Sequence, residues 1–128
     1  MNKLIIDAAN EKIFLMIITN ASIYNITHEN TKINYEKLTI IINDFLLSKN
    51  LKIADIGVIY INIGLGSFAG IRNSMSVVKA FNVAKNIDYY CYNLDDFKDE
   101  KDLSYENIPN LCKKYKIKKN LINPIYIS

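Results

Sequence analysis

The chain has 128 residues, 50% of them apolar and 23% charged, which is enough for one domain with a modest core. This balance excludes a disordered, collagen-like or disulfide-scaffold chain, and a net charge of +3 is too small to indicate nucleic-acid binding by itself. The longest unbroken apolar run, Ile13 to Ile18, is too short for a membrane span, and polar residues break the N-terminal stretch that a signal peptide would need. We therefore expect a cytoplasmic protein with no membrane partner.

The first part of the chain is typical of a meander of three strands. Residues 2–9 and 12–19 are β-branched apolar runs separated by Asn10 and Glu11, and residues 22–27 alternate between apolar and polar side chains. Because the turns between these runs are short, antiparallel pairing is expected.

A helix is predicted next, from Asn34 to Asn50, because apolar residues recur there with helical spacing. Asn34 is suited to the N-cap and Asn50 to the stop. Ile40 and Leu47 lie on the side of this helix opposite its main apolar stripe, where a surface helix is normally polar. A second surface is therefore expected to cover them.

A strand, a glycine-rich turn and a second helix follow as one unit. Residues 56–63 are a nearly continuous apolar run, typical of a strand covered on both faces, and a helix is predicted over residues 70–86. Two apolar stripes run along this helix, one with Ile71, Met75 and Val78, the other with Val77, Ala80, Phe81 and Ala84. One stripe can cover the sheet, and the other needs a second surface.

The last third of the chain has weaker patterns. Residues 88–93 predict a short strand, residues 94–119 a weak helical region broken by Pro109, and residues 123–127 an extended end. No internal repeat or linker marks a second domain.

Three of the four glycines, Gly64, Gly66 and Gly70, fall within seven residues at the start of the second helix. Glycine permits positive φ and close approach, and N–H groups at a helix start commonly bind phosphate or carboxylate. A tight structural turn is the alternative, since the loop lacks the Lys-Ser/Thr of a P-loop. Arg72, the only arginine, is either retained for a bidentate anion contact or retained by chance.

Asp7 ends the first strand and is the candidate for holding a metal-bound water or a nucleotide phosphate. The alternative is an acid that only satisfies the amides of the following turn. No zinc site or disulfide framework is expected, because His28 is the only histidine and Cys91 and Cys112 lie far apart.

Charge divides the C-terminal region into an acidic and a basic part. Residues 95–106 hold six acids against two lysines, whereas residues 107–128 hold no acid. With Tyr115 among them for stacking, the lysines of the basic part predict a phosphate-binding stripe, and a solvated helix end is the alternative. These lysines are Lys113, Lys114, Lys116, Lys118 and Lys119.

Several segments together resemble the bacterial TsaB (YeaZ) family. They are Leu4-Ile5-Ile6-Asp7, the helix after three strands, Gly64-Leu65-Gly66-Ser67-Phe68-Ala69-Gly70-Ile71-Arg72, Lys79-Ala80 and Pro124-Ile125-Tyr126-Ile127. The glycine segment is similar to the family's GPGSFTGLR signature, through Gly64, Gly66, Ser67, Phe68, Gly70 and Arg72. The resemblance covers about residues 1–97 and the last few residues.

The resemblance implies an α/β chain with the actin-like, ribonuclease H-like (ASKHA) fold. A single subdomain, residues 1–97, would hold a five-stranded mixed sheet with flanking helices, and residues 98–128 would be a short C-terminal remnant with a helix and an extended tail. It also implies a role in threonylcarbamoylation of adenosine 37 in tRNAs that read codons beginning with A. Family members are not the catalyst; they dimerise with the TsaD-type transferase paralogue through two main helices and activate it, and a TsaE-type ATPase joins them.

The chain departs from the family pattern at both loops. Leu65 replaces proline, Ala69 replaces threonine, Ser74 stands where glycine is favoured, and Asp7-Ala8-Ala9 replaces Asp-Thr-Ser. Lost hydroxyls argue against nucleotide chemistry and favour a scaffold. Family members usually carry a second, similar subdomain, so the expectation is a shortened member that kept the partner-binding half.

The leading hypothesis is thus a non-catalytic subunit without a cofactor, which forms a homodimer alone, binds the transferase paralogue and reaches tRNA through the complex. Residues near the interface would be Ile40, Leu47, Ile71, Met75 and Val78. The alternative is a small phosphotransferase or hydrolase of the same superfamily that uses Asp7 and the glycine loop. A third hypothesis is direct tRNA binding through the five lysines.

Overall fold

The computed structural model describes residues 1–121, so the extended end predicted for residues 123–127 lies outside the described residues. Five strands form one mixed sheet in the order β3-β2-β1-β4-β5. Their bounds are β1 (Asn2–Asp7), β2 (Lys12–Ile18), β3 (Ile23–Glu29), β4 (Ile56–Asn62) and β5 (Asp88–Tyr92). β1 to β3 pair antiparallel, and β4 pairs parallel with β1 and with β5. The predicted meander and mixed five-stranded sheet are confirmed.

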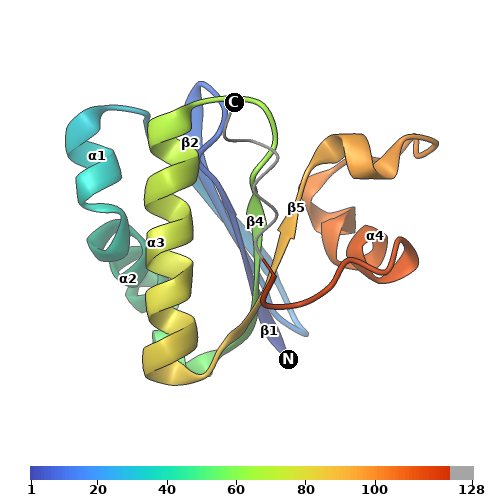
Figure 1. Ribbon diagram of the computed structural model, residues 1–128. Helices are drawn as coiled ribbons and strands as arrows, with labels where there is room; N and C mark the ends of the chain where they lie inside the picture. Colours follow the sequence, from blue (N-terminus) through green and yellow to red (C-terminus); the bar gives the residue numbers. More distant parts are fainter. Residues whose placement is uncertain (122–128) are drawn as a thin grey trace.

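Three helices cover one face of the sheet (Figure 1). They are α1 (Lys32–Glu36), α2 (Leu38–Ser48) and α3 (Phe68–Lys85), and their apolar side chains share one core with β1, β2 and β4. Leu4, Leu38, Leu46 and Ile59 are fully buried there. Within residues 1–121 no helix combines the length and the apolar character needed to cross a bilayer.

The helix predicted from Asn34 to Asn50 is two helices, which meet at Lys37. The prediction of Asn34 as N-cap is wrong: the Thr31 hydroxyl accepts the Asn34 N–H at 3.2 Å, and the Asn34 side chain donates to the Glu29 carbonyl instead. The stop at Asn50 is confirmed. Asn50 takes a left-handed φ of 59°, a conformation that asparagine tolerates at a helix end.

The C-terminal segment covers the other face of the sheet (Figure 1). It consists of the 3₁₀ turns η2 (Leu94–Phe97) and η3 (Tyr105–Asn107) and the helix α4 (Ile108–Lys114). A second core forms where Phe97, Ile108 and Leu111 pack on sheet residues such as Ile5 and Val58. Pro109 does not break a helix as predicted; it lies in the first turn of α4, where its missing N–H is tolerated.

Candidate functional site

Asp7 lies at the end of β1 and is almost fully buried, with 2% of its surface exposed. Its Oδ1 accepts the Ala9 backbone N–H at 3.0 Å. Its Oδ2 accepts the Asn10 amide at 2.9 Å, the Asn62 amide at 3.1 Å and the Tyr105 hydroxyl at 2.8 Å. A carboxylate offers about four acceptor positions, and here four donors from the protein occupy it, three at Oδ2 and one at Oδ1. The arrangement fits a structural anchor better than a ligand for metal or phosphate.

Four residues donate hydrogen bonds to Asp7, and two of them, Asn62 and Tyr105, were not predicted from the sequence. Asn62 ends β4 beside Asp7, because the carboxyl ends of parallel strands share one edge of a sheet. It is the one polar residue in the apolar run of residues 56–63, a signal that could have identified it. Tyr105 comes from η3, 98 residues away in sequence, and no local pattern marks it.

The glycine loop packs directly on the turn that follows β1. A Cβ atom on Gly70 would lie 1.8 Å from the Ala8 carbonyl oxygen, and one on Gly66 would lie 2.1 Å from that of Ala9. No glycine of the described chain has a positive φ. Of the two reasons for glycine, close approach is therefore the one that applies.

Hydrogen bonds within the protein hold the same loop. Ser67 is the N-cap of α3: its hydroxyl accepts the Gly70 N–H at 3.1 Å and the Tyr35 hydroxyl at 3.0 Å. The Ser67 N–H donates to the Ala9 carbonyl at 2.8 Å. The other side chains of the signature point outward, since Phe68 is 56% exposed and Arg72 is exposed without an ion pair among residues 1–121. The main role of the loop in this structure is therefore to pack the start of α3 against the turn after β1.

A cleft of about 740 Å³ opens next to this loop, between the turn after β1 and η3. The Tyr105 ring stacks on Phe14 at 4.0 Å in its wall. Lys12, the one cation among the described residues of the lining, pairs with Glu29, which lowers its availability for a phosphate. Among the described residues no group of three or more histidine, cysteine or acidic side chains is placed to hold a metal ion.

The predicted interface residues separate into two groups. Ile40 and Leu47 are exposed on α2, by 57% and 59%. Ile71 and Val78 are 3% and 1% exposed, and Met75 packs partly against the same core. The side chains of Ile71 and Val78 therefore belong to the core and offer no surface to a partner, whereas Ile40 and Leu47 do.

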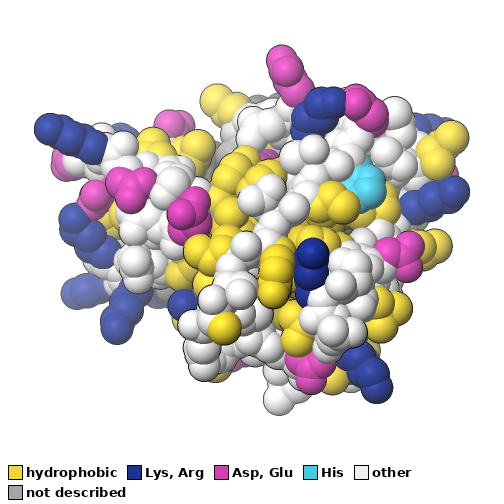
Figure 2. All heavy atoms as spheres, turned by 180° about the vertical axis from the view of Figure 1, so that it is seen from behind, with side chains coloured by type: hydrophobic (Ala, Val, Ile, Leu, Met, Phe, Trp, Pro, Cys, Tyr) yellow, Lys and Arg dark blue, Asp and Glu magenta, His cyan; other side chains and the backbone are white. Residues whose placement is uncertain are grey.

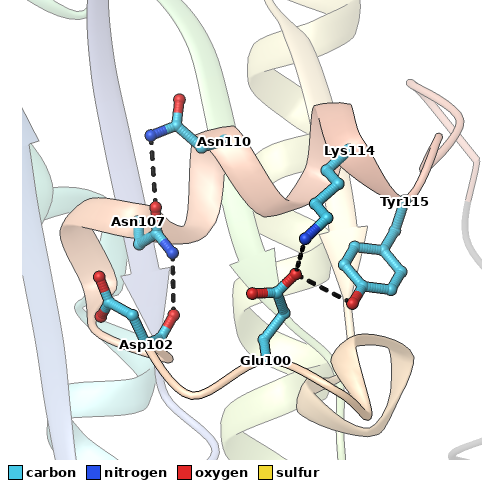
Figure 3. A network of polar contacts seen from close by, with 6 residues as sticks. All are labelled: Glu100, Asp102, Asn107, Asn110, Lys114 and Tyr115. Atoms are coloured by element: carbon cyan, nitrogen blue, oxygen red, sulfur yellow. Dashed lines mark hydrogen bonds and ion pairs between the residues drawn. The ribbon is translucent and has the colours of Figure 1, made fainter.

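The predicted tRNA-contact lysines also differ in their surroundings. Lys114 pairs with Glu100, whose carboxylate also accepts the Tyr115 hydroxyl at 3.0 Å (Figure 3). Lys119 lies 3.5 Å from Asp88. Within residues 1–121 the remaining three, Lys113, Lys116 and Lys118, are exposed and form no ion pair.

Buried or partly buried tyrosine and cysteine side chains in the core between the sheet and the C-terminal segment predict a loss of stability at alkaline pH. Burial raises the pKa of Tyr60 and of Cys112 to about 12, and burial followed by the Asp7 carboxylate raises the pKa of Tyr105. The unfolded chain releases these protons at their ordinary pKa values, about 9 to 10, so above that pH it binds fewer protons than the folded chain. Urea unfolding is expected to show a stability that falls steadily from about pH 9 toward pH 12. A constant stability with tyrosinate absorbance in the folded protein would contradict this.

Comparisons with known proteins place the fold. No family model matches the chain, and no curated protein matches it in sequence. Among solved structures, YeaZ from Pseudomonas aeruginosa aligns with a TM-score of 0.66 at 16% identity, over 72% of this chain and 43% of that one. A second structure, described as an uncharacterized protein with similarity to peptidase YeaZ from Pseudomonas aeruginosa, gives the same values. The chain thus spans less than half the length of these structures.

A different relative in the same comparison covers nearly all of the chain. RuvC from Thermus thermophilus, solved in complex with a Holliday junction substrate, aligns with a TM-score of 0.55 at 9% identity, over 99% of this chain and 86% of that one. The same protein solved alone gives a TM-score of 0.53. At such identities the likeness shows the fold alone. The chain therefore has a YeaZ-like fold of the ribonuclease H-like type, a mixed five-stranded sheet with flanking helices.

Proposed function

We propose that this chain is a non-catalytic subunit of the TsaB type, which binds a TsaD-type transferase paralogue and activates it in threonylcarbamoylation of adenosine 37 of tRNA. The observation that carries the proposal is an exposed apolar ridge on α1 and α2, here called the helix ridge. It consists of Ile33, Ile40 and Leu47, which are 61%, 57% and 59% exposed. The YeaZ-like fold and the loop signature support the same proposal.

The helix ridge has the geometry of a helix-packing surface. Ile40 and Leu47 are seven residues apart in α2, so they lie along one line on its outer side, and Ile33 adds a third exposed apolar side chain from α1. Val83, which is 84% exposed, and the exposed Ala80 add apolar side chains to the solvent side of α3, the helix that contacts α2. Large apolar side chains gathered in this way on a monomer favour association, and a partner helix pair would bury them.

The surroundings of Asp7 support a subunit without catalytic chemistry. A phosphotransferase or hydrolase would need the Asp7 carboxylate free to hold a metal ion or a water molecule. Here four donors from the protein occupy it, and the neighbouring loop is closed by its own backbone contacts. The superfamily enzyme is therefore the weaker candidate.

In the proposed assembly the helix ridge faces the paralogue, a TsaE-type ATPase joins the pair, and tRNA is reached through the complex. The paralogue has a related fold, so the same ridge can pair with a second copy of this chain when the paralogue is absent. A homodimer is then the resting form.

Charged substitutions in the helix ridge are expected to abolish this association. The chain alone and mixed with the TsaD-type paralogue from the same cell would be measured by light scattering coupled to size exclusion, and a one-to-one complex is expected. Because the ridge would lie at the centre of the interface, Ile40→Asp with Leu47→Asp should weaken the complex at least about tenfold. Both positions are exposed, so the fold should persist.

A matched control carries the same chemistry elsewhere. Ile23 at the start of β3 and Leu94 in η2 are 48% and 40% exposed and lie outside α1 to α3. Ile23→Asp with Leu94→Asp should leave the complex intact. The proposal fails if the unaltered chain does not bind the paralogue, or if both double variants bind the paralogue equally well.

A further inference from the structure

A groove runs across the sheet face beneath α4, on the opposite side of the sheet from the helix ridge. It is made of two hollows of about 470 Å³ and 180 Å³, which share Lys3, Tyr60 and Tyr90 in their linings and so adjoin one another. Lys113, at the end of α4, and Lys116, in the turn after it, line the groove on the side of the C-terminal segment. We call these five residues the basic groove.

The floor of the basic groove is aromatic. Tyr60 of β4 and Tyr90 of β5 are directly paired across the two strands, and their rings stack with centroids 5.3 Å apart and planes 12° apart. Tyr60 is 7% exposed, whereas Tyr90, on the edge strand, is half-buried. The Tyr90 ring therefore offers a rigid, flat surface on which another flat group can stack.

The rim of the groove is cationic, and its cations are available. Lys3, Lys113 and Lys116 form no ion pair within residues 1–121, whereas Lys114 is already held by Glu100 (Figure 3). Asp88, the one acid that residues 1–121 contribute to the lining, accepts the Asn120 amide at 2.8 Å and pairs with Lys119. Seen from behind, lysine side chains gather at the edge formed by the C-terminal segment, below its acidic side chains (Figure 2).

Lys116 occupies a backbone position that lysine does not favour. It follows α4 with a left-handed φ of 56°, and the Ile117 N–H donates to the Cys112 carbonyl at 2.9 Å to close the helix end. In the described part of the chain, the other three non-glycine residues with positive φ are all asparagine: Asn50, Asn86 and Asn120. Asparagine and glycine tolerate this conformation better than lysine does. A lysine at this place therefore points to a use for its charge.

We propose that the basic groove binds a single-stranded segment of nucleic acid, with a base stacked on Tyr90 and the phosphates on Lys3, Lys113 and Lys116. Cations that flank an exposed aromatic ring are the combination by which single strands are held without sequence readout. An anionic membrane would instead need several apolar side chains that protrude, and here only Met1 does so among the described lining residues, since Val58, Pro109 and Cys112 are buried. The inference concerns this chain alone and does not rest on the proposed function.

Fluorescence anisotropy with labelled single-stranded RNA and DNA octamers tests the groove on the full chain. We expect binding that weakens with salt. In the variant Lys3→Gln, Lys113→Gln, Lys116→Gln, the slope of log affinity against log salt should become shallower by about 2, since each phosphate contact contributes about 0.7. Tyr90→Leu should weaken binding about tenfold, and Tyr90→Phe, which keeps the ring, should not.

The control removes the same charge from the opposite face. Lys37, Lys79 and Lys85 are exposed on or next to the helices there, and their change to glutamine should leave the salt slope unaltered. Equal losses in both triple variants would overturn the proposal, because the binding would then follow net charge alone. So would binding of polyglutamate or of phosphatidylserine vesicles that matches the octamers and depends on the same lysines. If Tyr90→Leu lowers the melting temperature, the comparison of the two triple lysine variants still tests whether the groove binds nucleic acid.

Discussion

Gly70→Ala is expected to destabilise the protein by about 3 kcal/mol or more, a large part of the stability of an ordinary domain. Glycine to alanine inside a helix is normally stabilising by roughly 1 kcal/mol. Here the sign reverses, because the new Cβ would lie 1.8 Å from the Ala8 carbonyl oxygen. That oxygen belongs to the backbone, so α3 and the turn after β1 would have to separate. Urea unfolding followed by circular dichroism measures the change.

Gly57→Ala is the matched control, since a Cβ there also meets a close neighbour, the Met1 side chain at 2.4 Å. Met1 is 75% exposed and its side chain can swing away, so little loss is expected. Gly66→Ala should behave like Gly70→Ala, with its Cβ 2.1 Å from the Ala9 carbonyl oxygen. If Gly70→Ala were as stable as Gly57→Ala, the loop would not be the packing device described above.

This result bears on how a loop signature should be interpreted. The glycine spacing predicted a close backbone approach or a ligand at the start of a helix, and both need the same residues. Which of them applies depends on Ala8 and Ala9, whose carbonyls occupy the space that a ligand would take. The sequence predicted that each segment follows a strand, but it gave neither the pairing of those two strands nor the distance between their loops.

Local patterns predicted the strands well, because the hydrophobic periodicity of a strand or a helix can be recognised from residues that are close together in the sequence. The three opening strands, residues 56–62 and residues 88–92 are all found where alternation or apolar runs predicted them. The start of the first helix was misplaced because Thr31 and Asn34 are both good capping residues, and only the contact of the Asn34 side chain with the Glu29 carbonyl decides between them.

Burial of the second helix and docking of the C-terminal segment were harder to predict for a shared reason. Both depend on contacts between residues far apart in the chain. The sequence pattern put Ile71 and Val78 on a different stripe of the helix from Phe81. In the structure all three side chains are buried in the same core, because a wide face of α3 is buried. The 3₁₀ turns after β5 carry no period at all, and a contact such as Tyr105 with Asp7 fixes their place.

Asp7→Ala is expected to cost about 3 kcal/mol, and the loss should be coupled to Tyr105. Removing the carboxylate leaves buried donors from Asn62 and Ala9 and the Tyr105 hydroxyl without their acceptor. Tyr105→Phe removes one hydrogen bond to a charged group, at about 1.5 kcal/mol, while its ring keeps the stack on Phe14. Tyr24→Phe on β3, whose hydroxyl has no hydrogen bond within the described residues, serves as the control.

The double variant decides whether the C-terminal segment and β1 fold as one unit. Once Asp7 is alanine, Tyr105→Phe no longer removes a hydrogen bond to a carboxylate. The free energy of unfolding lost in the double variant should therefore be about 1 kcal/mol smaller than the sum of the two single losses. Additive losses would contradict the anchor role. Millimolar Mg²⁺ should not change the melting temperature of the unaltered chain, since the Asp7 carboxylate is buried and already accepts four hydrogen bonds from the protein. A Mg²⁺-dependent rise that Asp7→Ala removes would instead favour the superfamily enzyme over the partner subunit.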